Sequence, residues 1–230
     1  KDFDPFIGKT FRGNSMRTGY YGPGTFSTCK GVKWKFKTNG KVWSSPVVVE
    51  GVVYVGSDDG NVYAINAADG TEKWRFPTGG KVIAAPAIAD GKVFISSHGS
   101  GWLFALDAKT GSEIWRYNKD PKNPKRFAAW TSPGYAYGHV FVGTRGGFIG
   151  LEADTGKKVW QYRFGKMNAG MLAPTFHGTT IFIPTNDIIP VAIDLRTEMK
   201  LSHGHGNHCK ASLAYEDGVV FYNNGPGSKA

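Results

Sequence analysis

Between residues 42 and 77, turn residues separate four short runs, most of them rich in β-branched and aromatic residues. The runs are Ser45–Val49, Val52–Ser57, Asn61–Asn66 and Glu72–Phe76. The separators are Glu50-Gly51, Asp58-Asp59-Gly60 and Ala68-Asp69-Gly70. Gly and Asp tolerate a positive φ at low cost, so they favour hairpin turns. Short runs of this kind between such turns predict four β-strands joined by tight hairpins.

The same unit recurs along the chain. A Trp recurs at intervals of 40, 41 and 45 residues, at Trp34, Trp74, Trp115 and Trp160. An aromatic residue follows each of them two positions later. A second landmark keeps this period in the segments Ala64–Gly70, Ala105–Gly111 and Gly150–Gly156, with a weaker copy at Ala192–Glu198. A period of 40 to 45 residues with four strands per unit is typical of a β-propeller blade.

The pattern therefore predicts an all-β fold, a β-propeller of four-stranded antiparallel blades. One such sheet cannot bury both of its faces, so blades stack face to face around an axis. We expect the repeated Trp to be a wedge between blades in the wide outer part of the ring. About five blades are visible, at residues 31–70, 71–111, 112–156, 157–198 and, incomplete, 199–230.

Residues 1–30 form a lead-in segment with weak periodicity. They could complete a five-bladed ring by adding a strand to the last blade. We favour instead a larger ring of seven or eight blades, of which these repeats are a part, because the last repeat stops after its second strand.

Composition narrows the function only slightly. The 230 residues carry a net charge of +10, and no apolar run is long enough to cross a membrane as a helix. The densest basic cluster, Lys119, Lys122, Lys125 and Arg126, lies in an insertion of the third repeat. Because no recognition motif accompanies the charge, we expect a solvated basic surface, which could meet an anionic surface, rather than specific nucleic-acid binding. Cys29 and Cys209 could pair across the ring closure or stay as two thiols.

Residues 40–74 follow the pattern Gly-x-Val-x-Ser-Ser-Pro-Val-Val-x-x-Gly-Val-Val-Tyr-Val-Gly-Ser-x-Asp-Gly-x-Val-Tyr-Ala-Ile-Asn-Ala-x-x-Gly-x-x-x-Trp. This repeat resembles the pyrroloquinoline-quinone-like (PQQ-like) propeller family over about residues 31–222. The family includes quinoprotein alcohol dehydrogenases and the barrel-assembly lipoprotein of bacterial outer membranes. The resemblance implies a propeller and a periplasmic or extracellular location, but a repeat identifies architecture rather than chemistry.

A PQQ cofactor would lie near the axis, where the residues that enter each innermost strand should converge. Aligning the repeats on their Ser-Pro or Ala-Pro pair gives the candidates at this position. They are Trp43, Ile83, Trp130, Met171 and Lys210. Trp43 and Trp130 could stack on a planar quinone, while Lys210 or Arg126 could neutralise its carboxylates. The chain lacks the adjacent cysteine pair that the resemblance would lead one to expect, and it shows no set of Asp, Glu and Asn ligands for calcium.

A second candidate site is the run His203-Gly204-His205-Gly206-Asn207-His208-Cys209. Three imidazoles and one thiol provide enough ligand types for a transition metal. The spacing matches no zinc-finger or haem-attachment pattern, so a His- and Gly-rich loop is the competing interpretation.

Three functions remain open. The first is a non-catalytic scaffold that contacts other protein subunits of a larger assembly and holds no cofactor. The second is a PQQ-dependent oxidoreductase or electron-transfer subunit with a site near Trp43 and Trp130. The third, which rests on charge alone, is a module that binds an anionic polymer.

Overall fold

The computed structural model describes residues 31–118, 122, 131–144, 147–163, 173–184, 191–197, 200–203, 214–216 and 219–221. All regular structure within these residues is β-strand, and every strand pairing is antiparallel. The described part of the chain contains no helix of the length and apolar character that a membrane span needs. The predicted all-β fold of four-stranded antiparallel blades is confirmed.

Four sheets have four strands each, in chain order from one edge to the other. The first contains β1 (Val47–Val49), β2 (Val52–Gly56), β3 (Asn61–Asn66) and β4 (Glu72–Pro77). The second contains β5 (Ala87–Ala89), β6 (Lys92–Ser96), β7 (Leu103–Asp107) and β8 (Glu113–Tyr117). The third contains β9 (Gly134–Ala136), β10 (His139–Thr144), β11 (Gly147–Glu152) and β12 (Lys158–Arg163).

The fourth sheet contains β13 (Thr175–His177), β14 (Thr180–Ile183), β15 (Val191–Asp194) and β16 (Lys200–His203). A two-stranded sheet follows, with β17 (Ala214–Glu216) and β18 (Val219–Phe221). The sequence-based units are offset from these sheets by one strand, because each unit boundary falls between the third and fourth strands of a sheet. The lead-in at residues 1–30 lies outside the described residues.

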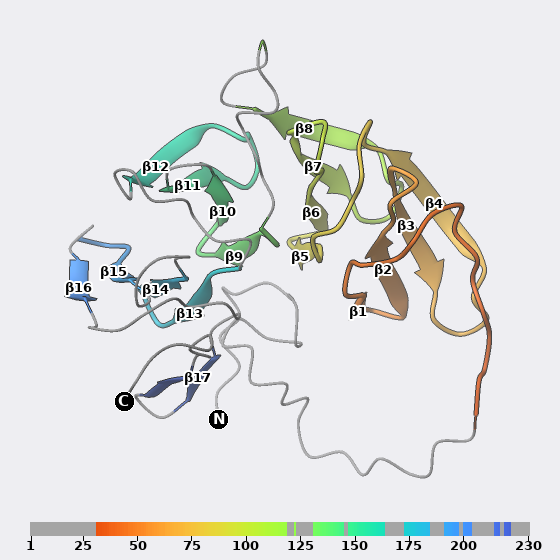
Figure 1. Ribbon diagram of the computed structural model, residues 1–230, viewed down its shortest axis with the longest axis horizontal. Coiled ribbons are helices and arrows are strands. Elements are labelled where there is room, and N and C mark those ends of the chain that lie inside the picture. The colour runs from red at the N-terminus through yellow and green to blue at the C-terminus, as the bar shows by residue number, and fades with distance from the viewer. Residues whose placement is uncertain are drawn as a thin grey trace, which may run out of the picture.

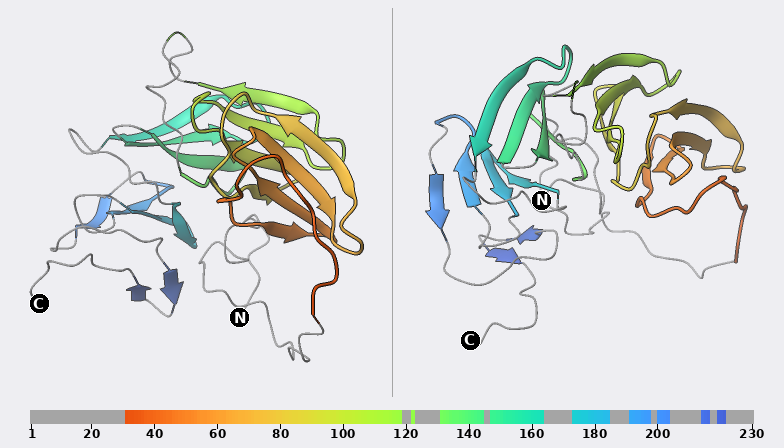
Figure 2. Two further views of the ribbon diagram at one scale, coloured as in Figure 1. Left: turned by 45° about the vertical axis from the view of Figure 1, so that its right-hand side comes forward. Right: turned by 45° about the horizontal axis from the view of Figure 1, so that its top comes forward.

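The sheets follow one another along an arc (Figure 1), with the first strand of each on the inside and the fourth on the outside. Figure 2 shows the same stacking from two other sides. First strands of successive sheets contact one another, as β1 does with β5 and β5 with β9. The arrangement is that of propeller blades around an axis.

The hairpins between first and second strands use the predicted turn residues. Glu50 and Gly51 have φ values of 48° and 74°, and Asp90 and Gly91 have 48° and 68°. Positive φ at both central residues is the type I′ turn, whose twist matches that of paired strands. Strand β1 begins at Val47 rather than at the predicted Ser45, because Pro46 has no N–H to donate to the ladder.

The repeated Trp joins one sheet to the next, as predicted. The indole Nε1 of Trp74 donates to the carbonyl oxygen of Ala108 at 3.0 Å, and that of Trp115 donates to Ala153 at 2.8 Å. Each acceptor lies in the turn between the third and fourth strands of the following sheet. The rings are buried and lie against Gly111 and Gly156 in the same turns. The indole therefore fills the outer space between two blades and satisfies its N–H there.

This packing makes Gly111→Ala a test of the wedge. Gly111 has a φ of +74°, and a Cβ there would lie 2.6 Å from Cδ2 of Trp74. Gly91 is the matched control, since its φ is +68° and nothing lies within 4 Å of its Cβ position. We expect Gly91→Ala to lower the free energy of unfolding by about 1–2 kcal/mol from backbone strain alone, and Gly111→Ala to cost about 1–3 kcal/mol more from overpacking. Urea denaturation measures both; equal losses would contradict the wedge.

Candidate functional site

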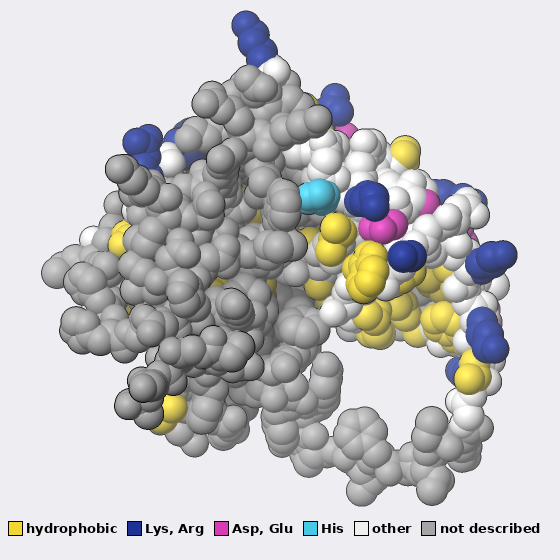
Figure 3. Space-filling model, viewed as in Figure 1, with side chains coloured by type: hydrophobic (Ala, Val, Ile, Leu, Met, Phe, Trp, Pro, Cys, Tyr) yellow, Lys and Arg dark blue, Asp and Glu magenta, His cyan; other side chains and the backbone are white. Residues whose placement is uncertain are grey.

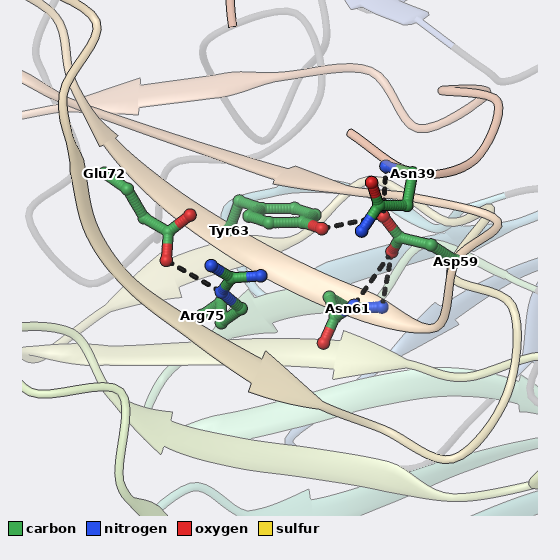
Figure 4. A network of polar contacts seen from close by, with 6 residues as sticks. All are labelled: Asn39, Asp59, Asn61, Tyr63, Glu72 and Arg75. Atoms are coloured by element: carbon green, nitrogen blue, oxygen red, sulfur yellow. Dashed lines mark hydrogen bonds and ion pairs between the residues drawn. The ribbon is translucent and has the colours of Figure 1, made fainter. Parts of the chain in front are cut away.

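Asp59, in the hairpin between β2 and β3, is the centre of a polar network (Figure 4). Its Oδ1 accepts hydrogen bonds from the backbone N–H and the Nδ2 of Asn61, at 3.0 and 3.1 Å. Its Oδ2 accepts from the hydroxyl of Tyr63 at 2.7 Å and from the backbone N–H of Asn39 at 2.9 Å. Partial burial acts to raise the pKa of Asp59, but the hydrogen bonds from Tyr63, Asn61 and Asn39 outweigh it and lower that pKa.

Tyr63 is buried beneath this carboxylate. Burial, and then the hydrogen bond to Asp59 and its negative charge, raise the pKa of Tyr63 to about 12. The guanidinium of Arg75, 6.0 Å from the ring centroid, opposes this rise and is itself held by Glu72 at 2.8 Å. At neutral pH the phenol stays protonated and donates to an ionised carboxylate. The network therefore fastens the segment before β1 to a hairpin and leaves neither group free to act as a base.

Next to it, Asp58 links the first sheet to the second. Lys81 Nζ lies 3.3 Å from Asp58 Oδ2, and the backbone N–H of Asp58 donates to the carbonyl of Lys41 at 2.8 Å. The backbone N–H of His98 donates in turn to the carbonyl of Lys81 at 2.7 Å. The Oδ1 of Asp58 is buried without a hydrogen-bond partner among the described residues. These contacts therefore join the hairpin between β2 and β3 to the segments that precede β1 and β5.

Polar pairs on the opposite loop face also join neighbouring sheets. The hydroxyl of Tyr135 donates a short hydrogen bond to Asp90 Oδ2, and burial followed by this bond raises the pKa of Tyr135. Lys92 Nζ lies 2.7 Å from Asp154 Oδ1. Both pairs connect the second sheet with the third. On both faces, therefore, pairs of ionisable groups join neighbouring sheets.

Of the predicted cofactor residues, the structure describes Trp43 and the aligned Ile83. Trp43 lies in the segment leading into β1 and is 63% exposed, with Lys41 Nζ 6.0 Å from its ring centroid. Ile83 is half-buried at the corresponding place before β5. The neighbouring Ser44 is buried and donates to the carbonyl of Ala84 at 2.9 Å, so the connectors themselves are fixed. Trp130, Met171, Lys210 and Arg126 lie outside the described residues, so a shared quinone site stays a prediction.

The His-rich segment is described only at its start. His203 is the last residue of β16, the outer strand of the fourth sheet. His205, His208 and Cys209 lie outside the described residues, as does Cys29. Within the ranges that the structure describes, no three His, Cys, Asp or Glu side chains come together to hold a metal ion. The metal site and the cysteine pairing therefore stay predictions.

Sequence reasoning missed the Asp59 network. Its signal was present in the spacing Asp59-x-Asn61-x-Tyr63, because alternate residues of a strand and its turn share one side. Asn39 gave no such signal, since its contact with Asp59 spans 20 residues.

Residues 30–197 match the family model described as outer membrane protein assembly factor BamB. Among solved structures, BamB from Moraxella catarrhalis is 20% identical with a TM-score of 0.69, covering 82% of this chain and 57% of that chain. Quinohemoprotein alcohol dehydrogenase from Comamonas testosteroni is 18% identical with a TM-score of 0.73, covering 94% of this chain and 45% of that chain. A quinohemoprotein alcohol dehydrogenase from Pseudomonas putida HK5 is 20% identical with a TM-score of 0.57, covering 70% and 34%.

The chain thus spans between 34% and 57% of the length of these structures. No curated protein matches the sequence. The similarity to the solved structures is one of fold, because identities near 20% identify architecture and not chemistry.

The Asp59 network leads to a pH-dependent prediction. Asp59→Asn should lower the free energy of unfolding at pH 7 by about 1–2 kcal/mol, because hydrogen bonds to a charged acceptor are replaced by an amide. A carboxylate with a lowered folded pKa stabilises fully above its unfolded pKa, about 4, and loses this contribution as the pH falls through the folded pKa. The difference between wild type and variant should therefore be constant from pH 5 to 7 and shrink below pH about 4.

Chemical denaturation at several pH values in this range measures the difference in free energy of unfolding. Tyr63→Phe is the matched control: it keeps the ring and removes one donor to Asp59. It should give a smaller loss with the same trend. A difference that does not change with pH would contradict the role assigned to the carboxylate.

Proposed function

The chain belongs to the PQQ-like repeat family of the outer membrane protein assembly factor BamB, and from this premise we propose that it is a non-catalytic propeller scaffold for protein–protein contact within a larger assembly. One observation carries the proposal: on both loop faces, ion pairs join neighbouring blades. Lys81 pairs with Asp58 and Lys92 with Asp154, in each case across two sheets. A catalytic acid or base needs a pKa near the working pH and access to a substrate.

The contact surface of this scaffold is the loop face that carries Trp43. Exposed Trp, Tyr and Arg are the side chains that most often dominate binding energy at protein interfaces. Trp43 is 63% exposed, and Lys81, which pairs with Asp58 in the hairpin between β2 and β3, has a side chain 59% exposed. The basic insertion at residues 119–126 and the His-rich segment extend this surface in our proposal.

The charge of the chain indicates the chemistry of the partner in our proposal. Figure 3 shows Lys and Arg spread around the described part of one face, not gathered in a single patch. A net charge of +10 favours an acidic protein partner, because spread positive charge steers such a partner over long range. A compact polyanion would need a dense cluster of basic side chains instead. By analogy with the outer-membrane assembly factor whose family it shares, we place the scaffold in the periplasm or outside the cell.

A PQQ-dependent oxidoreductase is the alternative, favoured by the exposed ring of Trp43 beside Lys41. When bound, the quinone would supply the redox chemistry. Trp43 and Trp130 would hold its plane by stacking, and Lys210 or Arg126 would neutralise its carboxylates.

We expect Trp43→Ala to reduce retention of the protein partner at least about 30-fold, as loss of an aromatic interface anchor does. The free energy of unfolding of the isolated chain should change by less than about 0.5 kcal/mol, because the ring is exposed. Ile114→Ala is the matched control, since Ile114 is also exposed (43%) but lies on the outer strand β8. The measurement is quantitative co-purification from the cells that make the protein. A strictly monomeric wild-type protein without a partner would overturn the scaffold.

The alternative is tested separately by titrating the purified protein with PQQ and Ca²⁺ while following Trp fluorescence and the quinone absorption band. The scaffold predicts no saturable binding. Saturable one-to-one binding that Trp43→Ala abolishes would place the oxidoreductase first.

A further inference from the structure

Residues 33–37, which come shortly before the first sheet, alternate between lysine and aromatic side chains. The indole N–H of Trp34 donates to the carbonyl oxygen of Ala67 at 3.0 Å, and Phe36 packs edge-on against Tyr63 with ring centroids 5.3 Å apart. Both rings are half-buried, whereas the lysines beside them are exposed. Because side chains of an extended segment alternate between two sides, the aromatic contacts direct all the ammonium groups to the other side.

We call Lys33, Lys35 and Lys37 the lysine row. No ion pair or hydrogen bond joins their side chains to another residue within the described ranges. Asp69, the carboxylate on which the charge of Lys33 acts, accepts hydrogen bonds from Thr71 at 2.9 and 2.7 Å instead. In Figure 3 basic side chains line the right-hand edge of the molecule, along which this segment runs in Figure 1.

The outer strands β4 and β8, whose Trp residues make the same contact as Trp34, neutralise this side within themselves. Arg75 Nε lies 2.8 Å from Glu72 Oε1, and Arg116 Nε lies 3.4 Å from Glu113 Oε1. Each glutamate comes two positions before the Trp, where the first repeat has Val32 instead, 74% exposed. The lysine row is therefore without the intrastrand carboxylate that the next two units provide.

Side chains on this side of an outer strand are exposed even where the preceding sheet is in place. The side chain of Arg116 is 55% exposed beside the first sheet, and Val159 is 42% exposed beside the second. Among the described residues, the fourth strand of each four-stranded sheet also pairs along one edge only. An open outward edge is thus common to these strands, and the residues on it distinguish the segment that carries the lysine row.

The spacing of the lysine row indicates which ligand fits it. Alternate residues of an extended segment are about 7 Å apart, so the three charges form a line about 13 Å long. An extended peptide with Asp or Glu at alternate positions repeats its carboxylates at the same interval, and opposite charges on paired strands attract. Addition of a strand to an open edge supplies backbone hydrogen bonds as well. A basic strand would be repelled, so the row also provides selectivity.

We propose that the lysine row docks an extended acidic segment of a partner protein, which adds to the outward edge of residues 33–37 with its carboxylates opposite the three lysines. This inference rests on the proposed scaffold function and names the chemistry of one partner. The sequence of the chain itself contains 28 Lys and Arg against 18 Asp and Glu, and no stretch of it has acidic residues at three alternate positions. A flat anionic surface would match the charge of the row but not its spacing.

The test measures the binding of two synthetic peptides to the full chain by fluorescence anisotropy at low ionic strength. One has three Glu at alternate positions between Thr and Val, and the other has the same composition with the three Glu adjacent. We expect the alternating peptide to bind at least about tenfold more tightly, because all three charge pairs form at once. The preference should vanish in about 1 M salt, which screens charges beyond about 3 Å. Equal affinities at low salt would overturn the inference, because charge alone would then be recognised.

Charge reversal locates the site. Lys35→Glu should weaken binding of the alternating peptide about tenfold, since one attraction becomes a repulsion. Lys109→Glu, at an exposed lysine in the turn between β7 and β8, is the matched control and should change it less than about twofold. A peptide whose central Glu is replaced by Lys should restore the affinity of the Lys35→Glu chain. Absence of this rescue would contradict direct pairing.

A second experiment identifies the partner in extracts of the cells that make the protein. A carbodiimide joins an amine to a carboxylate only where the two are in contact, and mass spectrometry then identifies the linked peptides. We expect Lys35 linked to an alternating acidic segment of another protein. A link to any other part of this protein would overturn the inference, because its own chain would then cover the row. If the alternating peptide is not preferred while Trp43→Ala still releases a partner, this inference fails and the scaffold function stands.

Discussion

The contact on which the architecture depends is the indole N–H of one sheet donating to a turn carbonyl of the next. The chain described here has no helix to cover a sheet, so each face must be buried by the neighbouring sheet. Trp74 and Trp115 make this contact with bond lengths of 3.0 and 2.8 Å. The acceptor turn must present glycine, because Gly111 and Gly156 combine a positive φ with close approach to the ring. A register shift in the third strand, where it pairs with the fourth, recurs in all four four-stranded sheets. In the first three of these sheets the fourth strand carries the Trp.

This way of joining blades determines which groups remain for function. Between sheets, the polar atoms at the loop ends are paired with one another, as in Asp90 with Tyr135 and Lys92 with Asp154. Charged groups held in such pairs order the loops. Among the described residues, the aromatic ring of Trp43 and the apolar side chain of Val48 remain exposed on the first sheet and the segment before it. A protein organised in this way is suited to binding other proteins over its loops and its ends.

The sequence predicted the blades because their signals are local. The β-branched and aromatic runs and the Gly and Asp turns lie within one unit, and each unit repeats them with one Trp every 40 to 45 residues. The Trp wedge followed from the same repeat, since a large buried ring with an N–H needs both space and an acceptor. The Asp59 network could be predicted only in part, because Tyr63 and Asn61 share its hairpin but Asn39 comes from 20 residues upstream. The quinone and metal candidates depend on residues of several loops, and spacing within one unit does not determine how such loops converge.

Val48 shows a further limit of sequence reasoning. Like Ile88, it is the middle residue of an apolar first strand, yet one side chain is 57% exposed and the other 5%. Every unit of a repeat carries the residues for two interfaces, and position in the array alone decides whether both are used. The charged residues follow the same logic: Lys33, Lys35 and Lys37 alternate with Trp34 and Phe36, as Lys73 and Arg75 do with Trp74 and Phe76. Their exposure on the far side of the strand is ordinary for an outer edge and discourages non-specific strand pairing.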